Sequence, residues 1–301
     1  MSDRAAACVQ TFQRLQDDIC SRLERLDGQG RFREDHWERP GGGGGRSRVI
    51  EGSLIEKGGV NFSEVHGTLT EAAGRSLGIA PGDFIATGVS IVLHPNNPWV
   101  PIIHMNVRFF EVDRGGGESL WWFGGGIDLT PHYVDVAAAG RFHRGLAAVC
   151  ARHSDVADYD ALKAQADDYF FIRHRDETRG VGGIFYDRLS EPSFDATFAF
   201  TREVAEAFYP LYADQCASTR DRHFGQAEVA WQRLRRGRYV EFNLVWDRGT
   251  RFGLETDGRT ESILMSLPPR ADWTYDHRVA ADTREARTLE ALRKGVDWIE
   301  A

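Results

Sequence analysis

Lysine and closely spaced cysteine are what this 301-residue chain most clearly lacks. It contains only three Lys beside 34 Arg, and its four cysteines form no CxxC pair. Such spacing predicts neither a zinc site, an iron–sulfur cluster nor a dense disulfide framework, so buried free thiols are expected. The arginine excess either supplies planar forks for ligand carboxylates or reflects genomic composition.

Long apolar runs and a secretory leader are also missing. No stretch approaches the roughly 18 apolar residues that span a bilayer, and the N-terminus lacks the segments of a signal peptide. We therefore expect a cytoplasmic protein without an integral membrane segment. The formal charge of −8 argues against a nucleic-acid partner. The absence of GxGxxG, GxxxxGK and GxSxG disfavours dinucleotide, P-loop and α/β-hydrolase folds.

Two strand-like runs place polar residues where a buried sheet would have apolar ones. In residues 101–111 an apolar set alternates with a polar set, His104, Asn106 and Arg108. In the preceding run the same parity puts Ser90 and His94 on one face. We interpret the runs as adjacent antiparallel strands whose shared face holds a polar ligand. A solvent-exposed sheet face is the alternative.

The whole chain predicts an α+β fold with an extensive antiparallel sheet. Strands are expected at about 48–55, 84–93, 101–111, 119–127, 181–187, 238–246 and 262–267, and helices at 8–26, 135–152, 158–173, 193–223 and 282–299. Because no repeat or long linker divides the chain, a single domain over 1–301 is expected. Residues 28–47, with glycines at 41–45, are predicted to form a flexible loop, either lid or linker.

Residues 121–128, WWFGGGID, join aromatic side chains to three glycines and one carboxylate. The glycines would let a flat ligand approach the backbone, and Asp128 could take or stabilise a proton on a buried N–H group. A β-bulge followed by a helix N-cap at Asp128 is the alternative.

Four histidines are candidates for metal ligation or proton transfer: His94, His104, His143 and His174. Their spacing matches no compact signature such as HExxH, so a metal site would require the fold to gather them. Histidines satisfied by backbone groups are the alternative. Four arginines near glycine-rich backbone suit ligand carboxylates, although a single exposed arginine is usually only solvated. They are Arg173, Arg175, Arg179 and Arg259.

Several long blocks resemble the oxygen-dependent coproporphyrinogen III oxidases. They are GGVNFSEVHG from Gly58, the block from Ser90 to Arg108, WWFGGGIDLTP from Trp121, YFFIRHRDETRGVGGIFYD from Tyr169, and EFNLVWDRGTRFGLETDGRTESILMSLPP from Glu241. The resemblance covers nearly the whole chain. It implies a large flat antiparallel sheet flanked by helices on both sides. It also implies oxidative decarboxylation of two propionates of coproporphyrinogen III to vinyl groups, giving protoporphyrinogen IX in haem biosynthesis, with O₂ as co-substrate.

The resemblance also implies roles for particular residues. Positions that contact substrate in the family correspond to Ser90, Asn106, Val107, Arg108, Asp257, Gly258 and Arg259. His104 stands at the proposed proton-donor position, and we add Asp128 as a candidate base for the pyrrole N–H. The four histidines above match residues assigned to a divalent metal in bacterial relatives, so a metal cofactor stays open. A homodimer contact is implied near Tyr239 to Thr274, where the apolar Ile263, Met265 and Leu267 would face either a partner or the core.

No flavin, haem, nicotinamide or iron–sulfur cluster is expected, since electron-rich pyrroles can themselves reduce oxygen. Two other classes remain as alternatives. One is a histidine-ligated metal enzyme, such as a hydrolase or dioxygenase. The other is a non-catalytic tetrapyrrole carrier that uses the same arginine and aromatic residues, with Asp128 as a helix cap.

Overall fold

The computed structural model describes residues 1–71, 74–75, 78–255 and 258–301, and its main feature is one antiparallel sheet. Seven strands of the described chain pair in the order β1-β2-β3-β4-β5-β6-β9. Their bounds are β1 Arg33–Glu38, β2 Gly43–Ile50, β3 Ile55–Thr68, β4 Asp83–Pro95, β5 Ile102–Gly115, β6 Glu118–Thr130 and β9 Gly182–Leu189. The predicted α+β fold with a large antiparallel sheet is confirmed.

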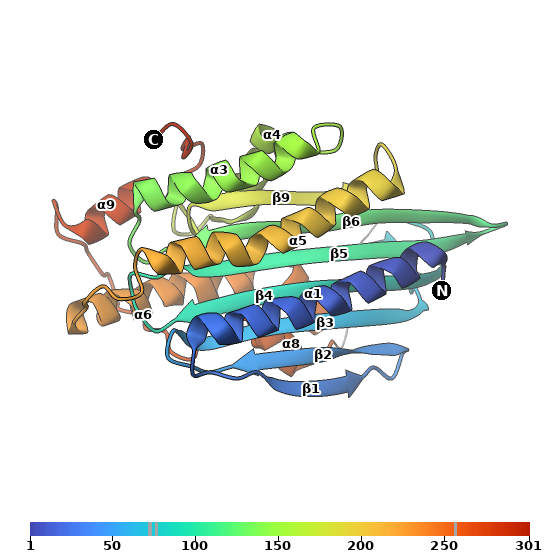
Figure 1. Cartoon of the computed structure of the whole chain (residues 1–301), viewed down its shortest axis with the longest axis horizontal. Helices are drawn as coiled ribbons and strands as arrows, with labels where there is room; N and C mark the ends of the chain where they lie inside the picture. The colour runs from blue at the N-terminus through green and yellow to red at the C-terminus, as the bar shows by residue number, and fades with distance from the viewer. Residues whose placement is uncertain (72–73, 76–77, 256–257) are drawn as a thin grey trace.

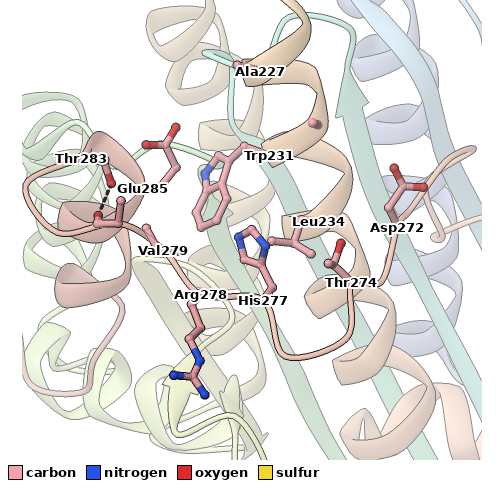
Figure 2. Close-up of a pocket in the computed structure, with 12 residues that line it drawn as sticks. Ala227, Trp231, Leu234, Asp272, Thr274, His277, Arg278, Val279, Thr283 and Glu285 are labelled. Carbon is pink, nitrogen blue, oxygen red and sulfur yellow. Dashed lines mark hydrogen bonds between the residues drawn. The ribbon is translucent and has the colours of Figure 1, made fainter.

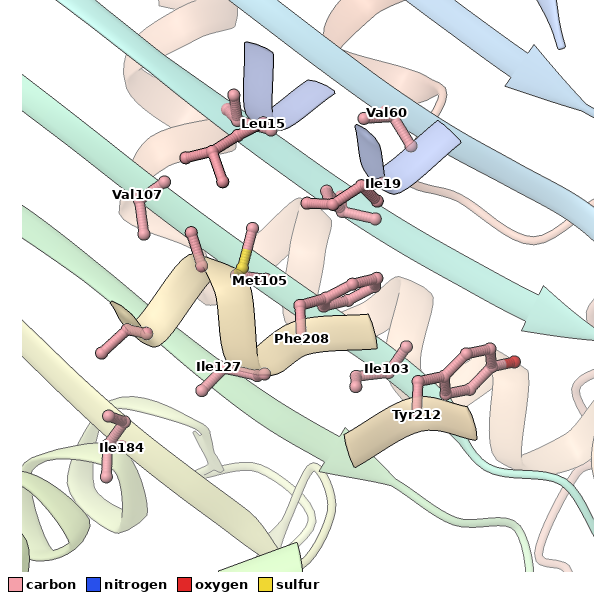
Figure 3. Close-up of a cluster of buried hydrophobic side chains, with 14 of the residues drawn as sticks. Leu15, Ile19, Val60, Ile103, Met105, Val107, Ile127, Ile184, Phe208 and Tyr212 are labelled. Atoms are coloured by element: carbon pink, nitrogen blue, oxygen red, sulfur yellow. The ribbon is translucent and has the colours of Figure 1, made fainter. Parts of the chain in front are cut away.

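One face of the sheet is covered by α1 (Asp3–Asp27), α3 (Val136–Arg152) and α5 (Phe194–Ala217) (Figure 1). The apolar set of β5, including Met105 and Val107, is fully buried against these helices. Figure 3 shows Ile19 of α1 and Phe208 of α5 over this layer. Burial of each such side chain contributes roughly 1.5–3 kcal/mol, so the apolar parity of β5 determines which sheet face remains for a ligand.

Behind the sheet in Figure 1 lie α6 (Gln226–Glu241) and α8 (Thr260–Leu264). Between them in the sequence come the π-helical segment η1 (Phe242–Trp246) and α7 (Arg248–Glu255). Lys57 of β3 donates a hydrogen bond to the Leu267 carbonyl at 2.9 Å, which ties the segment after α8 to the sheet. The remaining elements are α4 (Tyr159–Tyr169), β7 (Phe171–Ile172), β8 (Glu177–Thr178) and α9 (Arg284–Ala291). Among the described residues, no helix is both long and apolar enough to cross a membrane.

Two predicted strands are wrong, because residues 238–246 and 262–267 lie largely in helical segments, at the end of α6, in η1 and in α8. In the first segment the buried residues Tyr239 and Phe242 are three positions apart, which is a helical spacing, while Leu244 and Val245 are exposed. Helix α6 itself was not predicted. The predicted helix 282–299 ends at Ala291, and the chain beyond it turns at Gly295, which has a positive φ.

The glycine-rich stretch is not the loop predicted for 28–47. Residues 33–38 and 43–50 are strands of the sheet, and β2 pairs with both β1 and β3. Gly45 lies opposite Trp37, and a Cβ at Gly45 would come within 2.3 Å of that indole ring. Glycine is therefore needed here for the close approach of a neighbouring ring, which composition alone does not distinguish from flexibility.

Candidate functional site

A row of small or polar residues that ends at one aromatic ring crosses the sheet on the face away from α1 and α5. Because directly paired residues share a face of the sheet, the strand register aligns these positions from β1 to β9. The row runs through Asp35, Ser47, Asn61, Ser90, Asn106, Gly126 and Phe185. The predicted pairing of Ser90 with the polar face of β5 is confirmed by its register with Asn106. Both side chains are partly exposed, as a ligand-binding face requires.

A buried ionic group lies beside this row, where His104 of β5 is paired with Asp128 of β6. His104 Nδ1 lies 2.7 Å from Asp128 Oδ1. One guanidinium nitrogen of Arg179, Nη2, donates to both oxygens of Asp128 at 2.8 and 2.7 Å. The absence of side chains at Gly180 and Gly183 lets the chain around Arg179 pass close to β6. A Cβ at Gly180 would meet the Leu129 carbonyl at 2.2 Å, and one at Gly183 would meet the Ile127 carbonyl at 1.9 Å.

Aromatic rings enclose Arg179 almost completely. Its guanidinium carbon lies 4.2 Å from the ring centre of Phe170, 4.8 Å from Tyr239 and 4.7 Å from Phe242. Nη1 donates to Asn243 Oδ1 at 3.2 Å. Such cation–π contacts and hydrogen bonds compensate for the loss of water around the charge.

The charge state of Asp128 follows from these neighbours. Burial alone would raise the pKa of this carboxyl, but the charge of Arg179 and the hydrogen bond from His104 lower it below the ordinary value of 3.8. The ionised carboxylate accepts a hydrogen bond from the His104 Nδ1–H group. In the tautomer with its single ring proton on Nδ1, the other nitrogen, Nε2, is an acceptor. The His104 side chain is 21% exposed and Asp128 only 1%. His104 is therefore the member of the pair that can meet a ligand.

Arg108 extends over the same face, beyond Asn106. Its Nη1 donates to Asn106 Oδ1 at 3.0 Å, and its Nη2 donates to Asp187 Oδ1 at 2.7 Å across β6. The guanidinium passes over Gly124, whose hypothetical Cβ would lie 2.6 Å from Arg108 Cζ. The partly exposed Arg108 keeps N–H groups for a ligand carboxylate, because a guanidinium has five.

Two more of the predicted substrate-contacting residues, Gly258 and Arg259, lie toward the other edge of the sheet. Arg259 forms an ion pair with Asp35 of β1, and its guanidinium lies 6.0 Å from the Trp37 ring centre. Gly258 donates its N–H to the Gly253 carbonyl at 2.8 Å. Asp257 lies outside the residues that the structure describes. Four strand spacings of roughly 4.8 Å separate β1 from β5. Arg259 beside Asp35 and Arg108 beside Asn106 therefore lie on either side of Ser90 of β4.

Val107 differs from the other predicted contact residues. Its side chain is fully buried on the helix-covered face, among the core residues in Figure 3. The alternation that exposes Asn106 and Arg108 necessarily turns Val107 away from them. Its side chain therefore does not contribute to the polar face.

The four histidines do not come together. Within the described part of the chain, no group of three or more His, Cys, Asp or Glu side chains could hold a metal ion. His143 bonds through Nδ1 to Tyr159 and through Nε2 to the Val181 carbonyl. The prediction of one shared metal site is therefore not supported by the geometry.

The other two histidines have separate partners as well. His94 is completely buried and bonds to the Ser266 carbonyl, and burial lowers its pKa well below 6.5. His174 lies between Glu241 Oε2 at 2.8 Å and the indole N–H of Trp246 at 2.9 Å. The backbone-satisfied alternative therefore fits His94 at Nε2 only, since its Nδ1 is buried without a partner, and the partners of His174 are side chains.

A pocket of about 330 Å³ lies elsewhere, between α6 and the segment 272–285 (Figure 2). Trp231 and Leu234 of α6 form one wall, and His277 and Arg278 contribute to the other. None of the predicted site residues lines it. The chemistry described above is therefore on the sheet face and not in this pocket.

Two residues gain importance only from the structure. Arg179 was one of several arginines near glycines, and nothing in its sequence context indicated a bond to Asp128. Asp187 was not predicted at all. Its parity with Phe185 on β9 was the available signal, but that signal required the pairing of β9 with β6.

The family model described as coproporphyrinogen III oxidase matches residues 7–298, which is nearly the entire chain and includes every residue of the sheet face discussed above.

Proposed function

The chain belongs to the coproporphyrinogen III oxidase family, and we propose that it converts coproporphyrinogen III to protoporphyrinogen IX with O₂ as the oxidant. Family membership supports a role in porphyrin biosynthesis. Each of two propionate carboxylates loses CO₂, one proton and two electrons to become a vinyl group. Each O₂ takes up those two electrons with two protons to give hydrogen peroxide, so the substrate supplies all the reducing equivalents. The observation that carries this proposal is the presence of Arg108 and the His104–Asp128 pair on one sheet face.

The sheet face suits an uncharged macrocycle that carries anionic propionates. Gly124 and Gly126 leave the surface of β6 flat beside Asn106, and Phe185 adds an aromatic ring. Arg108 on one side and Arg259 on the other provide cations for propionates. Ser90 and Asn106 supply hydrogen-bonding groups between them.

Proton transfer is assigned to His104. With Nδ1–H held by the Asp128 carboxylate, Nε2 accepts a proton from a pyrrole N–H or a neighbouring carbon, and the charged ring then returns it. Asp128 stabilises the charged ring but is too buried to contact the substrate itself. This replaces our expectation of Asp128 as the direct base, since its exposed fraction is 1% and Arg179 bonds to both of its oxygens.

The cysteines favour a reaction with O₂ over a radical mechanism that would need an iron–sulfur cluster. All four are buried and free, and their sequence spacing offers no set of cluster ligands. We propose no flavin, haem or nicotinamide. A metal is not part of the proposal, because the four candidate histidines do not fit one ion.

A homodimer contact in the segment Tyr239 to Thr274 is also proposed. Large apolar side chains in this segment are exposed in the single chain: Leu244, Val245, Leu254 and Trp273. Ile263, Met265 and Leu267 are only partly buried and lie in the same segment. A second chain would remove this apolar surface from water.

The test is a comparison of aerobic and anaerobic turnover by purified, chelator-treated protein on coproporphyrinogen III. Protoporphyrin fluorescence after chemical oxidation reports product. We expect product to form only when O₂ is present, and we expect no added metal to be needed. Activity that returns only with a divalent metal would contradict the metal-free mechanism, and binding without O₂-dependent product would favour the carrier alternative.

A further inference from the structure

We infer that Asp187 is a positioning residue that holds Arg108 across β6 in the orientation needed to receive a substrate propionate. The inference rests on the proposed function and adds a residue that the sequence did not reveal. Three local features converge on it: a β-bulge, a glycine and a second anchor for the guanidinium.

The bulge lies in β9 opposite Gly124. Phe123 pairs with Leu189 and Gly125 pairs with Tyr186, so two residues of β9, Asp187 and Arg188, face the single Gly124 of β6. Arg188 has a φ of 55°, in the left-handed region. Bulges of this kind redirect side chains and are frequent beside active sites. Here the bulge leaves Asp187 on the same sheet face as Phe185, which is the face of the polar row. Leu189 lies on the opposite, helix-covered face, where it pairs with Phe123.

The missing side chain of Gly124 leaves the space through which Arg108 reaches Asp187. The three atoms nearest to a hypothetical Cβ at Gly124 all belong to Arg108: Cζ and Nη2 at 2.6 Å and Nε at 2.8 Å. Gly126 differs, since its Cβ would meet the Ile184 backbone carbonyl at 2.6 Å. Gly126 is therefore required by the sheet, whereas the space at Gly124 is filled by the Arg108 side chain.

The guanidinium has two fixed contacts, to Asn106 through Nη1 and to Asp187 through Nη2. An arginine without them would sample many rotamers, and ordering it would oppose substrate binding. Both Arg108 and Asp187 are partly exposed, so the pair contributes little to folding stability. Its consequence is instead a preordered cation with further N–H groups directed to the open face.

The decisive experiment is a double-mutant cycle on Asp187→Ala and Arg108→Ala, with KM and kcat measured on coproporphyrinogen III. Dissociation constants for the oxidised, unreactive coproporphyrin III provide a second readout. We expect Asp187→Ala to raise KM and Kd about three- to tenfold, with kcat changed less than about twofold. In the Arg108→Ala background, Asp187→Ala should have no further effect, because Asp187 acts through Arg108.

Two further variants separate this role from a general loss of structure. Asp187→Asn keeps an oxygen that accepts from Nη2, so it should restore much of the affinity lost in Asp187→Ala. Gly124→Ala displaces only the Arg108 side chain and should reproduce the Asp187→Ala increase in KM. Asp214→Ala is the matched control, since Asp214 forms a similarly exposed ion pair with Arg141 between α5 and α3. It should leave KM and Kd unchanged.

The inference is overturned if Asp187→Ala leaves both KM and Kd unchanged, if it lowers kcat alone, or if its effect persists undiminished without Arg108. Should Asp187→Ala fail to fold, Asp187→Ser, whose shorter side chain does not reach Nη2, takes its place in the same cycle with the same expected rise in both constants. If the wild-type protein binds coproporphyrin III but forms no product from coproporphyrinogen III, the proposed function fails. The dissociation constants for coproporphyrin III then still test the role of Asp187.

Discussion

Two arginine–aspartate pairs lie a few residues apart on the same three strands and their flanking loop, and they differ in burial. Arg179 and Asp128 have side chains exposed by only 2% and 1%, whereas those of Arg108 and Asp187 are exposed by 39% and 37%. The closest N–O distance is 2.7 Å in both pairs. This distance alone would therefore rank the two pairs as equal. They differ in that Arg179 bonds to both oxygens of Asp128 and Arg108 to one oxygen of Asp187, and above all in their surroundings.

The difference in burial separates two tasks. A buried pair is costly to break, because the remaining charge has no water to replace its partner. Such a pair holds His104 in one orientation, as the proposed proton transfer requires. An exposed pair contributes little stability and is screened by solvent, so a substrate carboxylate can approach Arg108 without disturbing the fold.

The largest expected effect follows from replacing Asp128 by Asn. The amide has no negative charge to stabilise protonated His104, so we expect kcat to fall about 10²- to 10⁴-fold with KM close to that of the wild type. Steady-state kinetics on protein shown to be folded by circular dichroism is the measurement. A kcat within twofold of the wild-type value would remove the His104–Asp128 pair from the mechanism.

The next effect compares the two pairs directly. Arg179→Met leaves Asp128 buried and unpaired, and we expect the free energy of unfolding to fall by about 3–5 kcal/mol. Arg108→Met removes the same charge at the partly exposed site, where the loss should be at most about 1 kcal/mol. Urea unfolding of both variants gives the two values. Equal losses would show that burial does not distinguish the pairs.

Glu241 provides an intermediate case, with 13% of its side chain exposed. It receives hydrogen bonds from Arg175, Arg238 and Trp273 and contacts His174. Burial alone would raise the pKa of its carboxyl, but the hydrogen bonds from Arg175 and His174 lead the effects that lower it from 4.5 to about 2. Its stabilising contribution is therefore complete above about pH 5 and is lost as the pH falls toward 2.

We accordingly expect Glu241→Gln to reduce the free energy of unfolding by roughly 3 kcal/mol at pH 7. The difference from the wild-type protein should shrink progressively between pH 4.5 and 2, because the wild-type carboxyl becomes protonated there. Urea titrations across this pH range give the measurement. A difference independent of pH would mean that Glu241 contributes through packing and not through its charge.

The sequence predicted the central sheet well, because β4, β5 and β6 contain alternating patterns that only one strand parity satisfies. The parity that buries Met105 also exposes His104 and Arg108. Prediction from the sequence failed where apolar residues fit both a helical and a strand periodicity, as at Tyr239 and Phe242. It also failed where a glycine allows close packing, as at Gly45. In these segments the tertiary contacts, which no local pattern records, determine the structure.

The site was predictable in part for the same reason. Residues on a single strand could be assigned to one face, and His104 with Arg108 was found in this way. Asp128 was found as a conspicuous carboxylate, but its actual role depends on Arg179, 51 positions later in the chain. Asp187 requires both the β6–β9 pairing and a bulge. Contacts between distant segments cannot be read from local periodicity.

The smallest expected effect is on the salt dependence of substrate binding. Raising the salt concentration from 0.1 to 1 M shortens the screening distance from about 10 to about 3 Å, so we expect KM to rise about two- to fivefold. The cause is screening at the exposed Arg108, while the buried Arg179 is protected from the ions. Arg108→Ala should therefore reduce the salt dependence, and Arg141→Ala, the matched exposed arginine on α3, should preserve it. If Arg108→Ala retained the full wild-type slope, the propionate would be bound by another cation, and the division of tasks between the two pairs would have to be revised.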